Sequence, residues 1–209
     1  MTRARLLDIA VREFGAKGLD GAATRDIAAA AGTAMSSITY HYGGKEGLYL
    51  AAADHIAAHM TDAMAPALAA EAGVGEGDPV AARAALRRLI GRLVDKMGEP
   101  DDAGVSLFLQ REQLQPGEAF ERIWAGMMGQ VTTRLADLVH EATGAALPDA
   151  RLATLTLLGQ AMSVRASRAA VLRLCEIDEI DPGTLARLKA RIDSNIDAIL
   201  DRMVAEEQQ

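Results

Sequence analysis

Apolar residues recur every three or four positions along most of the chain, and short stretches rich in glycine, proline or acidic residues interrupt this pattern. Such spacing places the apolar side chains on one face of an α-helix. Clusters of the β-branched and aromatic residues that are typical of strands are few. The sequence therefore predicts an all-α fold with about nine helices, over residues 3–17, 25–31, 34–41, 45–70, 79–97, 105–114, 118–143, 150–174 and 182–205.

Two of the interruptions carry a specific helix-start signal. Asp78 precedes Pro79, and Asp181 precedes Pro182. An aspartate before the first turn accepts hydrogen bonds from the free amides of that turn, and proline suits the first helical position because no N–H is needed there. We therefore expect one helix to begin at Pro79, after the glycine-rich loop 71–78, and the last helix to begin at Pro182.

The stretch from Thr24 to Leu48 predicts two short helices and the start of a third. We expect Thr24 to cap the first helix through its hydroxyl, and Gly32 to end it in a left-handed conformation. Gly43 and Gly44 end the second helix. Two helices joined by a tight turn that contains glycine are typical of a helix-turn-helix, whose second helix enters the major groove of DNA.

The second of these short helices has an apolar side and a polar side. Ile38 and Tyr42 lie four positions apart and are expected to face inward. The other side chains include small hydroxyls, a tyrosine ring and an imidazole, which can reach bases or phosphates, and a lysine beside free helix amides is suited to bind phosphate. The predicted DNA-binding residues are Thr24, Arg25, Met35, Ser36, Ser37, Thr39, Tyr40, His41 and Lys45.

The run AAAAGTAMSSITYHYGGKEGLY resembles the DNA-binding signature of TetR-type transcription regulators, and the match covers about residues 3–56. The resemblance implies a homodimer with a three-helix head over residues 1–48 and a helical effector-binding and dimerisation domain over residues 49–209. It also implies that the last two predicted helices form the dimer interface. Met35 departs from the family pattern, which often has a polar or basic residue there, so Met35 offers no side-chain hydrogen bond to a base.

A later segment, LFLQREQLQPGEAFERIW, gathers aromatic residues that are scarce elsewhere, and methionines follow it. Small-molecule pockets are mostly apolar and aromatic with a few polar groups, although the same spacing is that of an ordinary helix core. The segment resembles the effector domain of the CecR-like branch of the TetR family, which is linked with responses to antibiotics and other toxic compounds. The resemblance implies a pocket for an apolar or amphipathic small molecule, with candidate lining residues Phe108, Arg111, Glu112, Phe120, Trp124, Met127 and Met128.

The formal charge of −7 is unevenly distributed. Residues 1–60 hold six of the 22 Lys/Arg and six of the 29 Asp/Glu, so the remaining 16 and 23 account for all of the negative charge. A neutral head on an acidic body predicts modest non-specific affinity for DNA, with selectivity resting on shape and base contacts. The single cysteine, Cys175, excludes a disulfide within the chain and is expected to be a buried packing thiol.

A membrane partner is not expected, because no apolar run reaches the length of a membrane span and no signal peptide is visible. A rival class is a helical small-molecule- or metal-binding protein, or an enzyme, with a vestigial DNA-binding head. His55 and His59 lie one helical turn apart, which is a metal-ligand spacing, but only Asp62 offers a third ligand nearby, so a solvated helix face is the preferred interpretation. No nucleophile–base pair and no phosphate-binding glycine loop is recognisable.

We therefore expect a cytoplasmic regulator with no catalytic activity, no cofactor and no resident metal. We interpret the protein as a repressor that binds a near-palindromic operator in double-stranded DNA as a homodimer. A small-molecule effector would release it by favouring a state that no longer fits the operator. Activation instead of repression is left open by the sequence.

Overall fold

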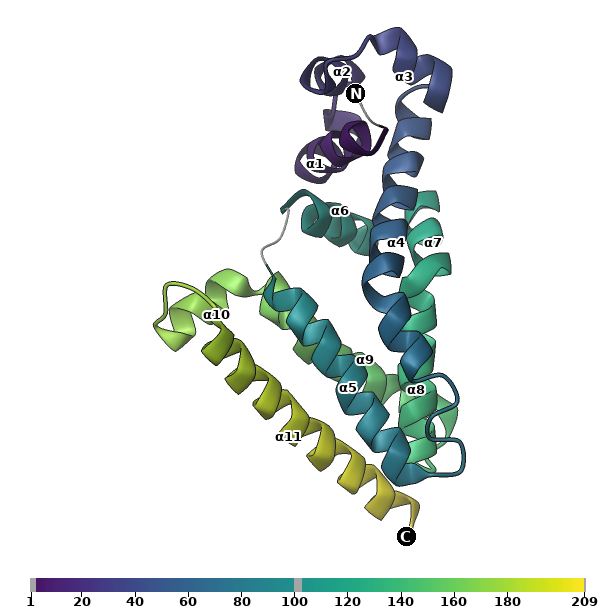
Figure 1. The fold of residues 1–209 in the computed structure, drawn as a ribbon, viewed down its shortest axis with the longest axis vertical. Helices are drawn as coiled ribbons and strands as arrows, with labels where there is room; N and C mark the ends of the chain where they lie inside the picture. Colours follow the sequence, from purple (N-terminus) through teal and green to yellow (C-terminus); the bar gives the residue numbers. More distant parts are fainter. Residues whose placement is uncertain (1–2, 100–102, 209) are drawn as a thin grey trace. The chain divides into compact units, whose positions relative to one another are not determined.

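The computed structural model of the protein describes residues 3–99 and 103–208, and every regular element in these ranges is helical (Figure 1). All nine predicted helices are present, which confirms the all-α fold, and two of them are interrupted. The elements are α1 (Arg3–Gly21), α2 (Thr24–Ala31), α3 (Met35–Tyr42), α4 (Lys45–Ala70), α5 (Pro79–Gly98), α6 (Ala103–Leu114), α7 (Glu118–Ile123), the π-helical turn η1 (Trp124–Met128), α8 (Gly129–Thr143), α9 (Leu147–Ala166), α10 (Arg168–Cys175) and α11 (Pro182–Glu207).

The chain forms two compact units, each made of two segments. The first unit contains residues 1–65 and 101–130, and the second contains residues 66–100 and 131–209. The first unit thus continues past residue 48, where we place the end of the DNA-binding domain, because α6 and α7 belong to the same compact body as α1 to α3. The functional boundary at residue 48 stays a prediction.

The core of the first unit is built from the apolar stripes of its helices. Phe14 of α1 and Phe108 of α6 are fully buried on either side of Tyr49 in α4. The ring of Tyr49 stacks on Phe108 with a centroid distance of 4.7 Å and meets Phe14 edge-on at 4.9 Å. Because three aromatic side chains from three helices meet here, burial of this cluster fixes α1, α4 and α6 against one another.

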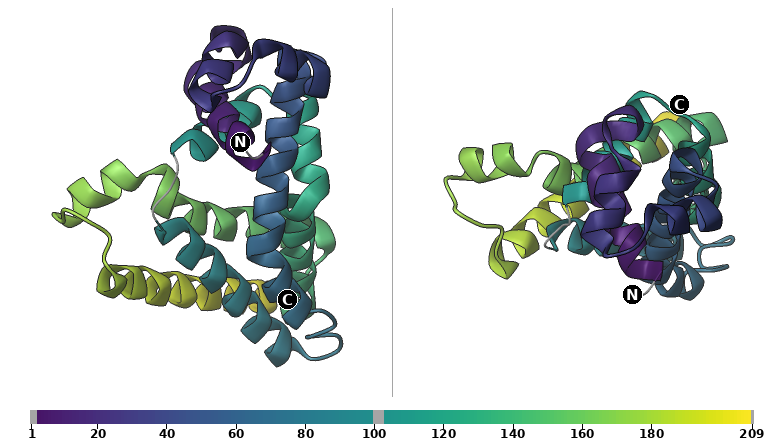
Figure 2. Two further views of the ribbon diagram at one scale, coloured as in Figure 1. Left: turned by 45° about the horizontal axis from the view of Figure 1, so that its top comes forward. Right: turned by 90° about the horizontal axis from the view of Figure 1, so that it is seen from above.

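The second unit packs α5 against α9 and α11, and the three helices run side by side (Figures 1 and 2). Ile192, Ile196 and Leu200 form the buried stripe of α11. Asp78 caps α5 as predicted, since its carboxylate accepts hydrogen bonds from the amides of Val80 and Ala81, both at 3.0 Å. The predicted cap Asp181 likewise accepts a hydrogen bond from the amide of the third residue after it.

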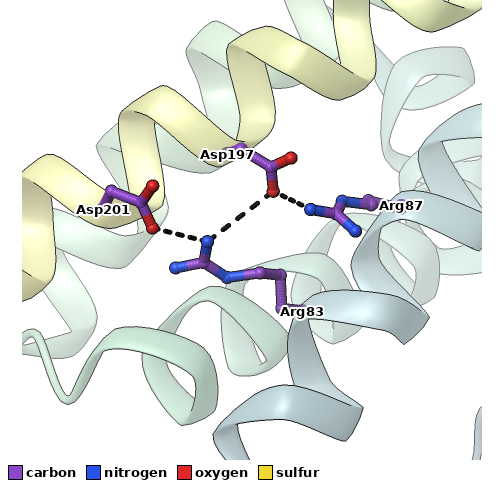
Figure 3. A network of polar contacts seen from close by, with 4 residues as sticks. All are labelled: Arg83, Arg87, Asp197 and Asp201. Atoms are coloured by element: carbon purple, nitrogen blue, oxygen red, sulfur yellow. Dashed lines mark hydrogen bonds and ion pairs between the residues drawn. The ribbon is translucent and has the colours of Figure 1, made fainter.

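An ionic network joins α5 to α11 (Figure 3). Arg83 donates to Asp201 at 2.5 Å and lies 3.6 Å from Asp197, which also binds Arg87. The hydrogen bond that Arg87 donates to Asp197 raises the pKa of Arg87 above its ordinary value. Since two arginines on one helix share two aspartates on the other, the pairs set the register of α11 along α5 as well as its attachment.

A second polar cluster holds the loop between α4 and α5. Glu71 is buried, and its two carboxylate oxygens accept hydrogen bonds from Arg88 at 2.6 and 2.7 Å. These hydrogen bonds lower the pKa of Glu71 below its ordinary value. Arg134 of α8 adds hydrogen bonds to the carbonyls of Glu71 and Val74. The loop is therefore tied to α5 and α8 by charged hydrogen bonds, although its sequence is rich in glycine.

Two predicted helices are divided, and one predicted burial is wrong. The helix expected over 118–143 contains the π-helical turn η1, where Gly126 leaves helical geometry with φ −79° and ψ −145°. The helix expected over 150–174 breaks at Ser167, whose ψ of 26° ends α9. Cys175 is exposed at the end of α10 instead of buried. None of the helices in the described ranges combines the length and the apolarity needed to cross a bilayer.

Candidate nucleic-acid interface

The turn between α2 and α3 depends on glycine, as predicted. Gly32 takes the left-handed conformation at φ 66°, and its amide donates to the carbonyl of Ala29 at 3.0 Å. The amide of Thr33 donates to the carbonyl of Ala28 at 2.9 Å, so the free carbonyls at the end of α2 are satisfied within the turn. Gly43 ends α3 in the same way at φ 76°. These two left-handed residues make α3 a separate, short helix.

The inner side of α3 is anchored by Ile38. Its side chain is 1% exposed and belongs to the same core cluster as Ile27 of α2 and Leu48 of α4. Tyr42 is half-buried against this cluster. Both residues therefore face inward, and their burial fixes which side of α3 is left to solvent.

The outer side of α3 carries large side chains that make few contacts within the chain. Tyr40 is 85% exposed and Met35 is 53% exposed. The rings of Tyr40 and His41 meet edge-on with a centroid distance of 5.0 Å. An aromatic ring left in water costs free energy unless a partner covers it, so such a pair marks a surface that is suited to contact another molecule. The predicted contact residues that are exposed on α3 are Met35, Ser36, Thr39, Tyr40 and His41, with Ser37 half-buried.

The predicted capping role of Thr24 is wrong. The residue before α2 is Ala23, whose carbonyl accepts hydrogen bonds from the amides of Asp26 and Ile27 at 3.0 and 3.2 Å. Thr24 is consequently the first residue inside α2, and no side chain caps the helix. The hydroxyl of Thr24 is not committed to a cap, and the predicted contact of Thr24 with phosphate stays a prediction.

The two basic candidates lie in different environments. The Arg25 side chain is 87% exposed, with its guanidinium 3.9 Å from the carboxylate of Asp26. Lys45 is half-buried and donates a hydrogen bond to the carbonyl of Asp20 at 3.0 Å, which ties the start of α4 to the end of α1. An ammonium group has three donors, so this contact leaves two for a phosphate.

The sequence-based prediction did not include the backbone amides at the starts of α2 and α3. Both helices follow an alanine, Ala23 and Ala34, and neither helix has a capping side chain. The first amides of a helix have no partner within the helix and attract anions. Alanine is a poor capping residue, so its presence before both helices was the signal that these amides have no side-chain cap.

The candidate ligand residues on α6 already make contacts within the first unit. Phe108 is part of the aromatic core. The guanidinium of Arg111 donates to the carbonyls of Gly15 at 2.8 Å and Ala16 at 3.0 Å. Glu112 is buried and accepts a 2.5 Å hydrogen bond from the hydroxyl of Tyr49. These side chains therefore link α6 to α1 and α4.

The candidates that follow α6 are more open. Phe120 stacks on Trp124 with a centroid distance of 6.0 Å, and Trp124 is 42% exposed. Met127 is buried, and Met128 is half-buried against the core. The backbone amide of Phe120 donates to the second carboxylate oxygen of Glu112 at 2.9 Å. This hydrogen bond connects the polar candidate Glu112 to the apolar candidate Phe120. A ligand pocket lined by the candidate residues stays a prediction.

Two known families match separate parts of the chain. The family described as bacterial regulatory proteins of the tetR family matches residues 6–52. The C-terminal domain of the HTH-type transcriptional dual regulator CecR matches residues 82–203. Among curated proteins, the HTH-type transcriptional dual regulator CecR of Shigella flexneri is 32% identical over 202 residues, which cover 94% of this chain and 90% of that protein.

Solved structures with the same fold are more distant in sequence. A TetR-like regulator from Rhodococcus sp. RHA1 superposes with a TM-score of 0.65 at 21% identity, covering 94% of this chain and 96% of that one. A TetR-family regulator from Streptomyces coelicolor gives 0.64 at 19%, covering 97% and 95%. AibR, solved in complex with isovaleryl coenzyme A and operator DNA, gives 0.65 at 18%, covering 92% and 96%.

The fold, the exposed second helix of the helix-turn-helix and the two family matches agree with one another. The identity to the Shigella flexneri protein extends over both the head and the C-terminal part. The chain belongs to the TetR family of DNA-binding transcriptional regulators and carries the C-terminal domain of the CecR branch.

Proposed function

We propose that the protein is a ligand-responsive repressor that binds a near-palindromic operator as a homodimer, with α3 in the major groove. The observation that supports it most is the outer face of α3, where Tyr40 is 85% exposed while Ile38 behind it is 1% exposed. A short helix with a buried anchor and an exposed aromatic face has the shape that groove reading requires.

The contacts divide by chemistry. Ser36, Thr39, Tyr40 and His41 would meet base edges or the walls of the groove, because hydroxyl and imidazole groups can donate and accept. Arg25, Lys45 and the uncapped amides of α2 and α3 would bind phosphates and set the register. Basic and acidic residues are equal in number over residues 1–60, so binding would depend on these few contacts instead of a broad positive surface.

The homodimer is supported by apolar side chains left on the surface of the second unit. Leu152 and Leu155 of α9 are 63% and 67% exposed, and Leu174 of α10 is 86% exposed. α11 buries its own apolar stripe against its neighbours. Two leucines one turn apart on a helix would be covered if a second copy packed α9 against α9 about a twofold axis.

Ligand release would act through α6. This helix carries Phe108, Arg111 and Glu112, and it crosses α1 at a point where glycines face each other, Gly15 on α1 and Gly104 on α6. A ligand that shifts α6 would therefore shift α1, which packs on α2 and α3 through the shared core. The ligand changes operator affinity only by as much as it prefers one arrangement over the other.

The experiment that tests the DNA-binding part is selection of bound duplexes from a random pool by the purified full-length protein. We expect enrichment of two half-sites related by a dyad, with centres one helical turn or about 10 base pairs apart, or a multiple of that spacing. Enrichment of a single asymmetric site, or of none, would reject the dimeric groove-reading mode.

The effector part is tested by screening compounds for release of the selected duplex. Amphipathic organic compounds are the class to screen, and acyl-coenzyme A esters are included because AibR, which shares the fold, was solved with isovaleryl coenzyme A. An effector of the proposed site should lose potency in Trp124→Ala, since the Trp124 side chain is 42% exposed beside Phe120. Equal potency on that variant would place the effector elsewhere.

A further inference from the structure

Three potential metal ligands meet on the surface of the first unit. Asp8 lies on α1, and His55 and His59 lie one turn apart on α4. Each offers one ligand atom, and these atoms all lie within 4.8 Å of one another. The spacing of the two histidines is visible in the sequence, but the third group comes from a residue 47 positions earlier. We propose that Asp8, His55 and His59 form a binding site for one divalent transition-metal ion.

The separations are close to those that an ion requires. Two ligand atoms that are each about 2.0 to 2.1 Å from a tetrahedral zinc ion lie roughly 3.3 Å apart. Oδ1 of Asp8 is 2.8 Å from Nε2 of His55, and the two imidazole rings have a centroid distance of 4.3 Å. His59 is exposed, so its side chain can turn by the small amount that brings its nitrogen nearer.

The helices that carry the ligands are held in place by the core. Leu7 precedes Asp8, Val11 lies one helical turn after it, Ile56 follows His55, and all three apolar residues are buried in one cluster. The backbone positions of Asp8 and His55 are therefore set before any ion arrives, which reduces the entropy that binding has to overcome. The ion would join α1 to α4 directly, at the surface of the first unit.

The donor set selects the class of ion. Two imidazoles and one carboxylate suit Zn²⁺, Co²⁺, Ni²⁺ or Fe²⁺, whereas Mg²⁺ and Ca²⁺ prefer oxygen ligands alone. His59 is exposed, the side chain of Asp8 is 48% exposed, and that of His55 is 14% exposed. One side of the ion would thus face water, so water or a further ligand completes its coordination. Binding replaces the Asp8–His55 hydrogen bond by bonds from both groups to the ion.

A simple ion pair explains only part of this arrangement. Asp8 and His55 alone would form the 2.8 Å contact whether or not a third group was present. The pair does not account for a second imidazole placed edge-on to the first, where it adds no hydrogen bond to Asp8. Coordination of one ion uses all three groups. The site lies at the contact of α1 with α4, and ion binding there does not require DNA.

The test uses full-length protein from which any purification tag has been removed and which has been treated with a chelator. Titration with Zn²⁺ is followed by calorimetry, and Co²⁺ is added separately as a spectroscopic probe of coordination by nitrogen and oxygen. We expect one ion per chain and a rise in the melting temperature with ion concentration, because the folded state binds the ion and the unfolded chain does not hold the site.

His59→Ala is the variant to measure first, because an exposed side chain can be removed without disturbing the core. It should weaken Zn²⁺ binding by about tenfold or more, since it removes an imidazole ligand, and so should Asp8→Asn, since it replaces a carboxylate by a neutral amide that is a poor zinc ligand. The matched control is His140→Ala, which removes a histidine of the second unit.

The outcomes are separable. Loss of binding in His59→Ala and Asp8→Asn, with retention in His140→Ala and normal melting of all three without metal, supports the site. No saturable binding by the parent protein, or equal binding by parent and His59→Ala, overturns it. Equal weakening by the His140→Ala control would also overturn it, because the ion would then be held by scattered surface histidines.

Discussion

Gly15 of α1 and Gly104 of α6 lie so close that a Cβ atom on Gly15 would be 2.2 Å from the carbonyl oxygen of Gly104. A Cβ atom on Gly104 would in turn be 2.6 Å from the Cα atom of Arg12. No side chain fits between these two backbones. The crossing therefore brings a helix that carries candidate ligand residues into direct contact with the first helix of the DNA-binding part.

Gly15→Ala should destabilise the first unit by about 1 to 3 kcal/mol, because the new methyl group must separate α1 from α6. The measurement is urea denaturation of the full-length protein, followed by circular dichroism. Gly21→Ala on the same helix is the control, since its Cβ would meet only the side chain of Lys17 at 3.4 Å, an ordinary contact distance. Equal stability of Gly15→Ala and Gly21→Ala would contradict the close crossing.

The buried pair of Tyr49 and Glu112 predicts a pH effect. Burial, and then the hydrogen bond to Glu112, raise the pKa of the Tyr49 phenol above its ordinary value. A group with a raised folded-state pKa contributes stability below its unfolded pKa of about 10, and this contribution is lost as the pH rises above that value. The parent protein should therefore lose stability above pH ~10 more steeply than Tyr49→Phe does.

At neutral pH, Tyr49→Phe should lower the free energy of unfolding by about 1 to 3 kcal/mol, because it leaves one oxygen of the buried Glu112 carboxylate without its donor. Denaturation at pH 7 and at alkaline pH measures both effects. Tyr42→Phe is the control, since it removes a hydroxyl from a half-buried tyrosine whose ring lies edge-on to that of His41 at a centroid distance of 6.5 Å. A Tyr49→Phe protein as stable as the parent at pH 7 would show that the hydrogen bond contributes little.

The exposed leucines of α9 predict the effect of a charge on assembly. Leu155→Glu should weaken the dimer by about 3 to 5 kcal/mol, because the twofold axis would bury two unpaired carboxylates at one contact. Sedimentation equilibrium over a range of protein concentrations measures the shift to monomer. Leu114→Glu, at a leucine 76% exposed at the end of α6, should leave the dimer intact. A dimer unaffected by Leu155→Glu would place the interface on another surface.

Local rules predicted most of the helices. Apolar spacing located all nine, and the Asp-Pro pairs located the starts of α5 and α11. The breaks within two of them were not predictable from spacing. Gly126 lies in an apolar run that keeps helical period, and Ser167 ends α9 among small residues that favour no particular termination. Both depend on how the helices pack, which a pattern along one chain does not record.

The candidate sites show the same limit. The exposed residues of α3 were predictable because one apolar residue, Ile38, defines the inner side of a short helix. The partners of Lys45, Arg111 and His55 were not, since each lies between 25 and 96 positions away. Thr24 misled the prediction because threonine is a common cap, while the helix begins one residue earlier. Contacts between distant residues need the fold before they can be assigned.

The most direct measurement of the central claim is the affinity of Tyr40→Ala for the selected operator duplex, measured by fluorescence anisotropy at fixed salt. We predict that specific binding weakens by about 1 to 3 kcal/mol, or roughly five- to 150-fold, while dimerisation and melting stay as in the parent. Leu114→Ala, which removes an apolar side chain that is 76% exposed on α6, should bind as the parent does. An unchanged operator affinity in Tyr40→Ala would contradict the assignment of α3 as the reading helix.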